Sequence, residues 1–272
     1  MLRIGIVQAT TGIDPAAEAR ALSDAIGALA AQDAQIVFTP EMSGYLDRDR
    51  KRAAGNIGFE ADDIVLTAVR DAAREHKVWV QLGSLALRQE TSLFANRSFV
   101  IDDEGEIRAR YDKIHLFDVT LAGGESYRES SAYRPGEAAV VAGTPWGGLG
   151  LTICYDVRFP ALHRALAEAG AVMLSVPAAF TRPTGAAHWH ILLRARAIET
   201  GCFVIAAAQT GIHADGRATY GHSLVIAPWG EILLDMGEAA GTALVEIDLD
   251  AVGEARGKVP ALEHARRFSL PA

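Results

Sequence analysis

The stretch Gly148-Leu-Gly-Leu-Thr-Ile-Cys-Tyr-Asp-Val-Arg-Phe-Pro160 places a thiol, that of Cys154, where an apolar run ends and a helix is expected to begin. Residues 149–153 have the composition of a buried strand, and Pro160 suits the first turn of a helix. The free N–H groups and positive dipole end of that helix favour thiolate over thiol. Cys154 is therefore a candidate nucleophile, although a free cysteine is more often a buried apolar side chain.

Strand-like and helix-like runs alternate around this stretch, which predicts strands separated by crossover helices. About ten strands are more than one twisted sheet holds comfortably. We therefore expect an α/β fold with two stacked mixed sheets between layers of helices. The expected strands are residues 2–8, 36–39, 78–82, 99–102, 107–111, 149–153, 171–176, 204–208, 222–227, 231–234 and 243–248, the expected helices are 15–32, 62–76, 160–169 and 187–200, and the longest polar loop is 121–136.

Composition limits the class of protein. The chain has 272 residues, 50% of them hydrophobic and 22% charged, which predicts a single globular domain over residues 1–272. A net charge of -8 without a cluster of Lys and Arg argues against a nucleic-acid partner. No apolar run approaches the roughly 20 residues of a membrane span, and residues 1–30 lack the features of a signal peptide. We expect a cytoplasmic protein that acts on a small molecule, with no membrane partner.

Cysteine and histidine spacing gives no metal-binding signature. Cys154 and Cys202 are the two cysteines and form no C-x-x-C pair, so neither a disulfide scaffold nor a zinc ribbon is expected. Cys202 begins an apolar run and is expected to be buried. A zinc hydrolase using His188 and His190 is an alternative, but H-E-x-x-H or comparable spacing is missing. We predict no metal and no organic cofactor.

Charged residues follow two of the expected strands. Glu41 comes after the strand 36–39, where burial would raise its pKa and suit it to accept a proton. Lys113 comes after the strand 107–111, where a fixed cation can stabilise an oxyanion. Either residue could instead lie on the surface. Glu129 could orient these two side chains, although the polar composition of its loop favours a solvated carboxylate.

A thiol, an amine and a carboxylate in one site would make a set for acyl transfer. Glu41 would take the proton of the Cys154 thiol, and the sulfur would attack a carbonyl carbon. Lys113 and the backbone N–H of Tyr155 would hold the oxyanion. Glu41 would then protonate the leaving ammonia and activate water to cleave the thioester.

These segments resemble the nitrilase or carbon-nitrogen hydrolase superfamily over residues 4–248. The resemblance implies a four-layer αββα sandwich that carries a Glu41-Lys113-Cys154 triad, with Glu129 as the second glutamate of the family. It also implies a homodimer or homotetramer formed through a helical face. The matching segments are Phe38-Thr-Pro-Glu-Met42, Arg110-Tyr-Asp-Lys-Ile-His-Leu-Phe-Asp118, Arg128-Glu-Ser130, Leu151-Thr-Ile-Cys-Tyr-Asp-Val-Arg-Phe-Pro160, Pro177-Ala-Ala-Phe-Thr181, Leu192-Leu-Arg-Ala-Arg-Ala-Ile-Glu-Thr200 and Tyr220-Gly-His-Ser-Leu-Val-Ile-Ala-Pro-Trp-Gly230.

Within the superfamily the chain resembles the Nit branch, whose members hydrolyse ω-amides of 2-oxo acids. The segment 195–209 favours deaminated glutathione over 2-oxoglutaramate as the substrate. The chain departs from the branch at His190, where a glutamate is usual, which puts substrate choice in doubt. An acidic substrate also needs cationic or donor groups, and the nearest candidates in sequence are Arg158, Arg182, Thr184 and His188.

Three further interpretations stay open at this point. The protein could be another amidase or an N-carbamoyl hydrolase of the superfamily. It could be a member that binds a small molecule without catalysis, because folds persist when their chemistry is lost. It could also be a redox sensor, since an environment that favours thiolate at Cys154 favours its oxidation too.

Overall fold

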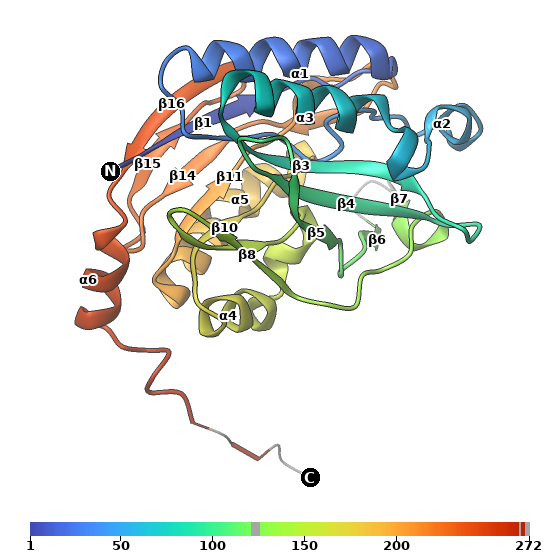
Figure 1. Cartoon of the computed structure of the whole chain (residues 1–272). Helices are drawn as coiled ribbons and strands as arrows, with labels where there is room; N and C mark the ends of the chain where they lie inside the picture. The colour runs from blue at the N-terminus through green and yellow to red at the C-terminus, as the bar shows by residue number, and fades with distance from the viewer. Residues whose placement is uncertain (121–125, 267, 270–272) are drawn as a thin grey trace.

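The computed structural model describes residues 1–120, 126–266 and 268–269, and its elements form four layers (Figure 1). Two six-stranded sheets pack face to face. Helices α1 and α3 cover the outer face of one sheet, and α4 and α5 cover the outer face of the other. The predicted αββα sandwich of two mixed sheets is confirmed.

The first sheet has the strand order β16-β1-β2-β3-β4-β5. Its central strands β1, β2 and β3 run parallel, whereas β16, β4 and β5 are antiparallel to their neighbours. The prediction from sequence missed the length of the β3–β4 hairpin. The strands are β1 (Leu2–Gln8), β2 (Ile36–Phe38), β3 (Trp79–Arg88), β4 (Phe94–Ile101), β5 (Ile107–Asp112) and β16 (Gly241–Ile247).

The second sheet has the order β15-β14-β11-β10-β9-β8. Followed from β8, it has the same succession of strand directions as the first sheet followed from β16. β9, β10 and β11 run parallel, β8 is an antiparallel edge strand beside β9, and β14 and β15 are antiparallel on the other side. The strands predicted at 222–227 and 231–234 are confirmed as β14 and β15, which pair as a hairpin. The strands are β8 (Val140–Thr144), β9 (Gly147–Leu151), β10 (Ala171–Ser175), β11 (Phe203–Ala206), β14 (Leu224–Ile226) and β15 (Ile232–Asp235).

The helices that connect parallel strands lie where the sequence predicted them, apart from their ends. Asp14 caps α1 by accepting the N–H groups of Ala16 and Ala17. Helix α5 begins at Arg182 rather than near residue 187, because Pro183 fits the first turn, where its missing N–H costs nothing. The helices are α1 (Pro15–Ala30), α2 (Arg50–Asn56), α3 (Ile64–His76), α4 (Pro160–Glu168), α5 (Arg182–Thr200) and α6 (Asp250–Lys258), with short 3₁₀ helices η1 (Glu60–Asp62), η2 (Glu129–Ser131) and η3 (Cys154–Arg158).

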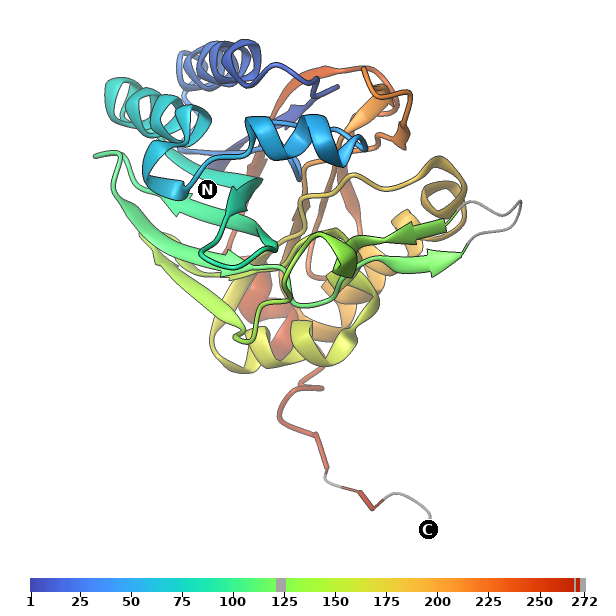
Figure 2. The ribbon, with the colours of Figure 1, turned by 90° about the vertical axis from the view of Figure 1, so that its right-hand side faces the viewer.

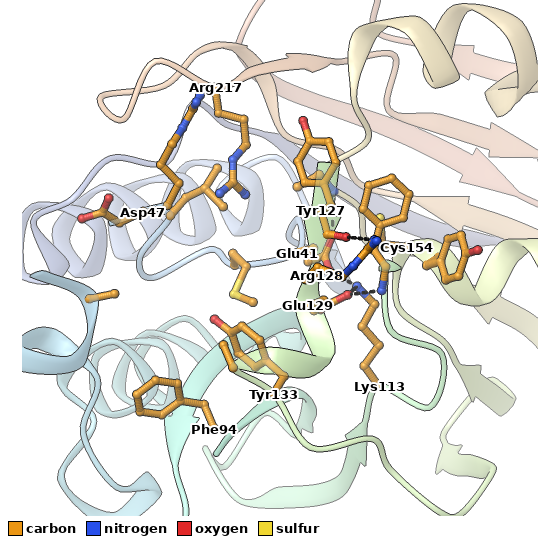
Figure 3. A pocket seen from close by; sticks show the side chains of 18 of the residues that line it. Glu41, Asp47, Phe94, Lys113, Tyr127, Arg128, Glu129, Tyr133, Cys154 and Arg217 are labelled. Atoms are coloured by element: carbon orange, nitrogen blue, oxygen red, sulfur yellow. Dashed lines mark hydrogen bonds and ion pairs between the residues drawn. The ribbon is translucent and has the colours of Figure 1, made fainter. Parts of the chain in front are cut away.

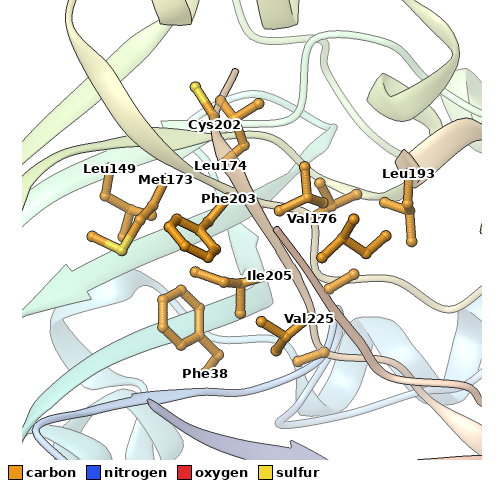
Figure 4. Close-up of a cluster of buried hydrophobic side chains, with 14 of the residues drawn as sticks. Phe38, Leu149, Met173, Leu174, Val176, Leu193, Cys202, Phe203, Ile205 and Val225 are labelled. Atoms are coloured by element: carbon orange, nitrogen blue, oxygen red, sulfur yellow. The ribbon is translucent and has the colours of Figure 1, made fainter. Parts of the chain in front are cut away.

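The core between the two sheets is apolar and fully buried. Phe38 of the first sheet lies beside Phe203 and Ile205 of the second (Figure 4). Burial of one such side chain contributes roughly 2–3 kcal/mol. Contacts of this kind fix the position of the first sheet against the second, and thereby the strand ends that carry the polar residues.

Two small antiparallel pairs lie outside the main sheets. β6 (Asp118–Thr120) pairs with β7 (Ser126–Arg128), and Figure 2 shows these green strands extending from the body of the molecule. β12 (Thr210–Ile212) pairs with β13 (Ala218–Tyr220). Of the predicted polar loop, residues 121–125 lie outside the described part, and the rest contains β7 and η2. Among the described residues, no helix combines the length and apolarity needed to cross a bilayer.

Candidate active site

The three principal polar residues predicted from the sequence meet at one pocket (Figure 3). Glu41 follows β2, Lys113 follows β5, and Cys154 follows β9, so each side chain is delivered by the end of a strand. The pocket has a volume of about 490 Å³, which is in the range of small-molecule sites. The first two strands belong to one sheet and the third to the other, so both sheets contribute to the site.

The Glu41 carboxylate is buried, with only 4% of the residue exposed. One oxygen, Oε1, accepts hydrogen bonds from Lys113 Nζ at 2.8 Å and Asn96 Nδ2 at 3.0 Å, and Oε2 accepts the N–H of Ala179 at 2.8 Å. Burial alone would raise the pKa of Glu41, as predicted. The charge of Lys113, with hydrogen bonds from Lys113, Cys154 and Asn96, outweighs burial and lowers that pKa below its usual value.

The backbone around Glu41 is held from both sides. Gln209 Nε2 donates to the Glu41 carbonyl at 2.9 Å, and the next residue, Met42, has a left-handed φ of 56° and donates its N–H to Ser84 Oγ. A Cβ on Gly83 would collide with the backbone carbonyls of the turn just before Glu41. Glycine is therefore required where β3 passes this turn.

Lys113 lies between two carboxylates rather than on the surface. Its Nζ is 2.8 Å from Glu41 Oε1 and 3.0 Å from both oxygens of Glu129. Burial lowers the pKa of Lys113, but the charges of Glu129 and Glu41 outweigh it and raise that pKa well above its usual value. Glu129 also accepts the N–H of Phe117 at 2.6 Å, so the expectation of a solvated carboxylate is wrong: its side chain is 13% exposed.

Cys154 begins η3 with a left-handed φ of 49°, a conformation that is uncommon for a non-glycine residue. Its N–H donates to the carbonyl of Pro177 at 2.8 Å. Burial and the neighbouring charge of Glu41 raise the pKa of the Cys154 thiol well above its usual value, although Lys113 opposes them. The environment therefore favours the thiol, not the thiolate that the sequence predicted, and a base is needed to activate the sulfur.

A buried aspartate, which the sequence interpretation did not single out, ties the Cys154 segment to the Lys113 segment. Asp156 Oδ2 accepts the hydroxyl of Tyr111 at 2.7 Å and the N–H of Ile153 at 2.8 Å. Asp156 Oδ1 accepts the N–H of His115 at 3.0 Å and contacts its Nδ1 at 2.7 Å. Its position in the Cys-Tyr-Asp motif, two residues from the thiol, was the available signal.

The residues predicted to bind substrate are only partly brought to the pocket. Thr184 lines it, and so does Tyr155, whose N–H is the predicted oxyanion donor.

Arg158 packs over the rings of Tyr155 and Phe180, and its guanidinium lies 3.4 Å from Nδ1 of His188, which is exposed. Arg182 is also exposed and contacts the carbonyl of Thr219 and the carboxylate of Glu238. Arg158, Arg182 and His188 are not among the described residues that line the pocket.

Three other arginines among the described residues line the pocket: Arg48, Arg128 and Arg217. Arg48 and Arg217 both contact the buried carboxylate of Asp215, at 3.8 Å and 3.4 Å. Figure 3 shows Arg217 across the pocket from Cys154. Two guanidinium groups thus share one carboxylate at the end of the pocket away from the thiol, which favours binding of an anionic group there. Residues so far apart in sequence carry no local signal of this convergence.

The second cysteine behaves as predicted. Cys202 is fully buried, and its Sγ lies 3.2 Å from the carbonyl of Ala171. It is not among the described pocket residues. Cys154 is therefore the thiol that a molecule in the pocket can reach.

The chain is similar to known proteins in sequence and in fold. The carbon-nitrogen hydrolase family model matches residues 3–257. A deaminated glutathione amidase from Yersinia enterocolitica is 43% identical over 238 residues, which are 86% of this chain and 83% of that protein. The crystal structure of the Caenorhabditis elegans NitFhit protein aligns with a TM-score of 0.90 and 37% identity over 97% of this chain, which spans 65% of the NitFhit chain.

An amidase from Nesterenkonia sp. AN1 is similar in structure, with a TM-score of 0.81 and 28% identity over 96% of this chain and 98% of that one. The structure is of a mutant, and it shows the result of a Michael addition of acrylamide at the active-site cysteine of that protein.

Proposed function

Because the chain belongs to the carbon-nitrogen hydrolase family, we propose that it is an amidase that cleaves an amide bond through a thioester on Cys154, without a cofactor. The observation that carries this proposal is the buried carboxylate of Glu41, which is hydrogen-bonded to the ammonium of Lys113 and lines the same pocket as the thiol of Cys154. A base beside a protonated thiol, with a fixed cation next to both, is the arrangement that acyl transfer requires.

In the first half of the reaction, Glu41 takes the proton of the Cys154 thiol while the sulfur attacks the amide carbon. The negative charge that develops on the carbonyl oxygen is stabilised by Lys113 and by the N–H of Tyr155. Glu41 then passes its proton to the amide nitrogen, the C–N bond breaks, and an amine leaves. The product on the enzyme is a Cys154 thioester.

In the second half, Glu41 takes a proton from water, and the resulting hydroxide attacks the thioester carbon. The C–S bond breaks, the carboxylic acid leaves, and the proton returns to sulfur. Glu41 is ionised at neutral pH because Lys113 lowers its pKa, so the carboxylate is ready to act as the base in both halves. Glu129 holds the Lys113 ammonium in place through both of its oxygens.

We propose deaminated glutathione as the substrate. This choice is supported by the 43% identical amidase and by the resemblance to the Nit branch. Deaminated glutathione carries carboxylates at both ends, and Arg48 and Arg217 supply guanidinium groups to bind one of them. Hydrolysis would release 2-oxoglutarate and cysteinylglycine, so the leaving group would be a peptide amine rather than ammonia.

A substrate panel tests this choice. Deaminated glutathione, 2-oxoglutaramate, an N-carbamoyl amino acid and a nitrile are compared by kcat/KM, with 2-oxoglutarate or ammonia as the measured product. We expect deaminated glutathione to be preferred. A preference for 2-oxoglutaramate would make the chain an ω-amidase, and a preference for either of the last two compounds would place it in another branch.

The test of the mechanism is Cys154→Ala, with Cys202→Ala as the matched control. We expect Cys154→Ala to abolish hydrolysis and to leave the far-UV circular dichroism unchanged, whereas Cys202→Ala keeps turnover. Rapid mixing of the wild type with substrate should add the mass of a 2-oxoglutaryl group to the Cys154 peptide. A Cys154→Ala protein that still turned over substrate would refute the role of the thiol, and a binding member without catalysis would show no acyl adduct.

The cytoplasmic location and the homodimer or homotetramer implied by the resemblance are also proposals. Sedimentation equilibrium of the full chain tests the oligomeric state, and fractionation of cells tests the compartment.

A further inference from the structure

Two imidazoles and a carboxylate converge away from the pocket, where α5, the segment that leads into β14 and the end of β15 meet. His190 Nε2 lies 3.0 Å from Asp235 Oδ2, and His222 Nδ1 lies 2.9 Å from Asp235 Oδ1. The ligand atoms of the three residues all lie within 4.8 Å of one another. None of the three belongs to the described residues that line the active-site pocket.

His222 is held so that its ring faces Asp235. Its φ of 54° lies in the left-handed region, which L-residues adopt rarely. Its N–H donates to the carbonyl of Gly237 at 2.7 Å, and its own carbonyl accepts Trp189 Nε1 at 2.8 Å. Tyr220 stacks on the imidazole with ring centroids 4.5 Å apart. This support on every side fixes the direction of the ring, as metal-ligating histidines require.

The set of donors fits zinc. Two imidazole nitrogens with one carboxylate oxygen form a three-residue zinc set that leaves the fourth position of a tetrahedron for water. Zinc bonds of 2.0–2.2 Å place neighbouring ligand atoms about 3.3 Å apart. His190 Nε2 and His222 Nδ1 lie 3.0 Å and 2.9 Å from the two different oxygens of Asp235, so one of the two imidazoles would have to shift slightly for both to share an ion with one oxygen. The side chains of His190, His222 and Asp235 are 29%, 21% and 34% exposed, so an ion and its water can reach them.

We propose that His190, His222 and Asp235 form a Zn²⁺ site with one bound water. Zinc would occupy the space between the three side chains, and it would replace the two hydrogen bonds that Asp235 makes to the imidazoles by metal–ligand bonds. The ion would cross-link α5, which covers the outer face of the second sheet, to β15, which is an edge strand of that sheet. These two elements are distant in sequence. The site lies outside the pocket, so the ion would take no part in the reaction at Cys154.

The sequence predicted no metal because the three ligands have no motif spacing. His188 and His190 were weighed as a ligand pair, but they face different partners: His188 lies beside Arg158, and His190 lies beside Asp235. The ligand pair is instead His190 with His222, which follows it after an intervening helix end and three strands.

The test measures Zn²⁺ binding to untagged full-length Cys154→Ala protein, which removes the active-site thiol as a competing ligand. Isothermal titration should give one ion per chain. His190→Gln and Asp235→Asn, each added to Cys154→Ala, should weaken binding at least 10-fold, because each removes one of three protein ligands. His188→Gln is the matched control, since it removes an exposed histidine from the same helix and should leave the affinity unchanged.

Two further measurements make the result independent of folding defects. Circular dichroism and thermal unfolding in excess chelator show whether each variant is folded without metal, and Zn²⁺ should raise the unfolding midpoint of the parent more than that of either variant. Co²⁺ in place of Zn²⁺ should give the visible absorption of a tetrahedral complex in the parent only. Absence of stoichiometric binding, or equal affinity in parent and His190→Gln, would overturn the proposal and leave a hydrogen-bonded His-Asp-His cluster.

Discussion

Asp156→Asn removes a charge at the centre of the active-site framework while keeping the shape of the side chain. Asp156 accepts four hydrogen bonds, two of them from the backbone N–H groups of Ile153 and His115. The side-chain amide of asparagine has two orientations at this position, related by exchange of its oxygen and its NH₂ group. In either orientation the NH₂ group faces one of the two backbone N–H groups, and a backbone N–H group cannot become an acceptor. One buried backbone donor is therefore left facing another donor in either orientation.

The size of the effect follows from these contacts. A hydrogen bond to a charged acceptor contributes about 1.5–3 kcal/mol, and an unsatisfied buried donor costs a similar amount. We expect Asp156→Asn to lower the free energy of unfolding on the order of 3 kcal/mol. Burial and the charge of Asp156 raise the pKa of Tyr111, so its phenol stays protonated in the wild type and donates to the carboxylate. That bond also weakens in the variant.

The same change should slow catalysis in protein that is still folded. Ile153 precedes Cys154, and His115 is two residues from Lys113, so loss of either hydrogen bond lets the thiol and the ammonium move apart. Misplacement by about 1 Å is enough for a loss on the order of 10²-fold in kcat. Urea unfolding gives the stability, and steady-state kinetics well below the unfolding midpoint gives kcat and KM separately.

Asp118→Asn is the control for this experiment, because Asp118 is exposed and its carboxylate accepts the N–H and the hydroxyl of Ser130. It should change neither stability nor kcat appreciably. If Asp156→Asn loses less than about 1 kcal/mol and keeps the wild-type kcat, Asp156 does not position the catalytic segments.

Three other results are expected. Lys113→Met should lower kcat on the order of 10²-fold or more. The variant also loses the charge and the hydrogen bond of Lys113, which lower the pKa of Glu41, so the acid limb of the kcat–pH profile should move to higher pH; a fixed limb would contradict this. Arg217→Gln should raise KM for deaminated glutathione roughly 10- to 100-fold and leave KM for neutral amides unchanged, whereas Arg158→Gln should leave both values unchanged. If Arg217→Gln raised KM equally for deaminated glutathione and for neutral amides, Arg217 would not bind a carboxylate selectively. Burial lowers the pKa of His163 from 6.5 to about 4, so the unfolded chain binds the proton first as the pH falls. The contribution of neutral His163 to the free energy of unfolding is complete above pH 6.5 and should decline by on the order of 3 kcal/mol by pH 4. Urea unfolding of His163→Leu should lack this decline, and parallel curves of stability against pH for the variant and the wild type would disprove it.

The sequence predicted the positions of Glu41, Lys113 and Cys154 because each follows an apolar run that ends abruptly. A strand fixes the direction of the chain, so the residue after it can be placed from local pattern alone. Glu129 was misjudged for the opposite reason. Its loop is polar in composition, but composition does not reveal that Lys113 and the N–H of Phe117 donate hydrogen bonds to its carboxylate.

The directions of the pKa shifts could be predicted from the sequence less well than the positions of the site residues. The helix that follows Cys154 suggested a thiolate, but burial of the thiol, together with the negative charge of Glu41, raises its pKa. Likewise, burial of Glu41 suggested a raised pKa, but Lys113 reverses the direction. In each case the deciding charge comes from a segment distant in sequence. The same holds for Arg48 and Arg217, which share Asp215 although no local pattern connects them.

The two sheets follow one pattern of strand directions, and this explains why the site lies between them. In each sheet the parallel strands end at the same edge, and packing the sheets face to face brings the two edges together. Glu41, from the first sheet, accepts the N–H of Ala179 and contacts the thiol of Cys154, both of which follow strands of the second. The base and the nucleophile therefore meet only when the sandwich is closed. Phe38, three residues before Glu41, packs against the second sheet, so the contact that stabilises the core also sets the distance from base to thiol.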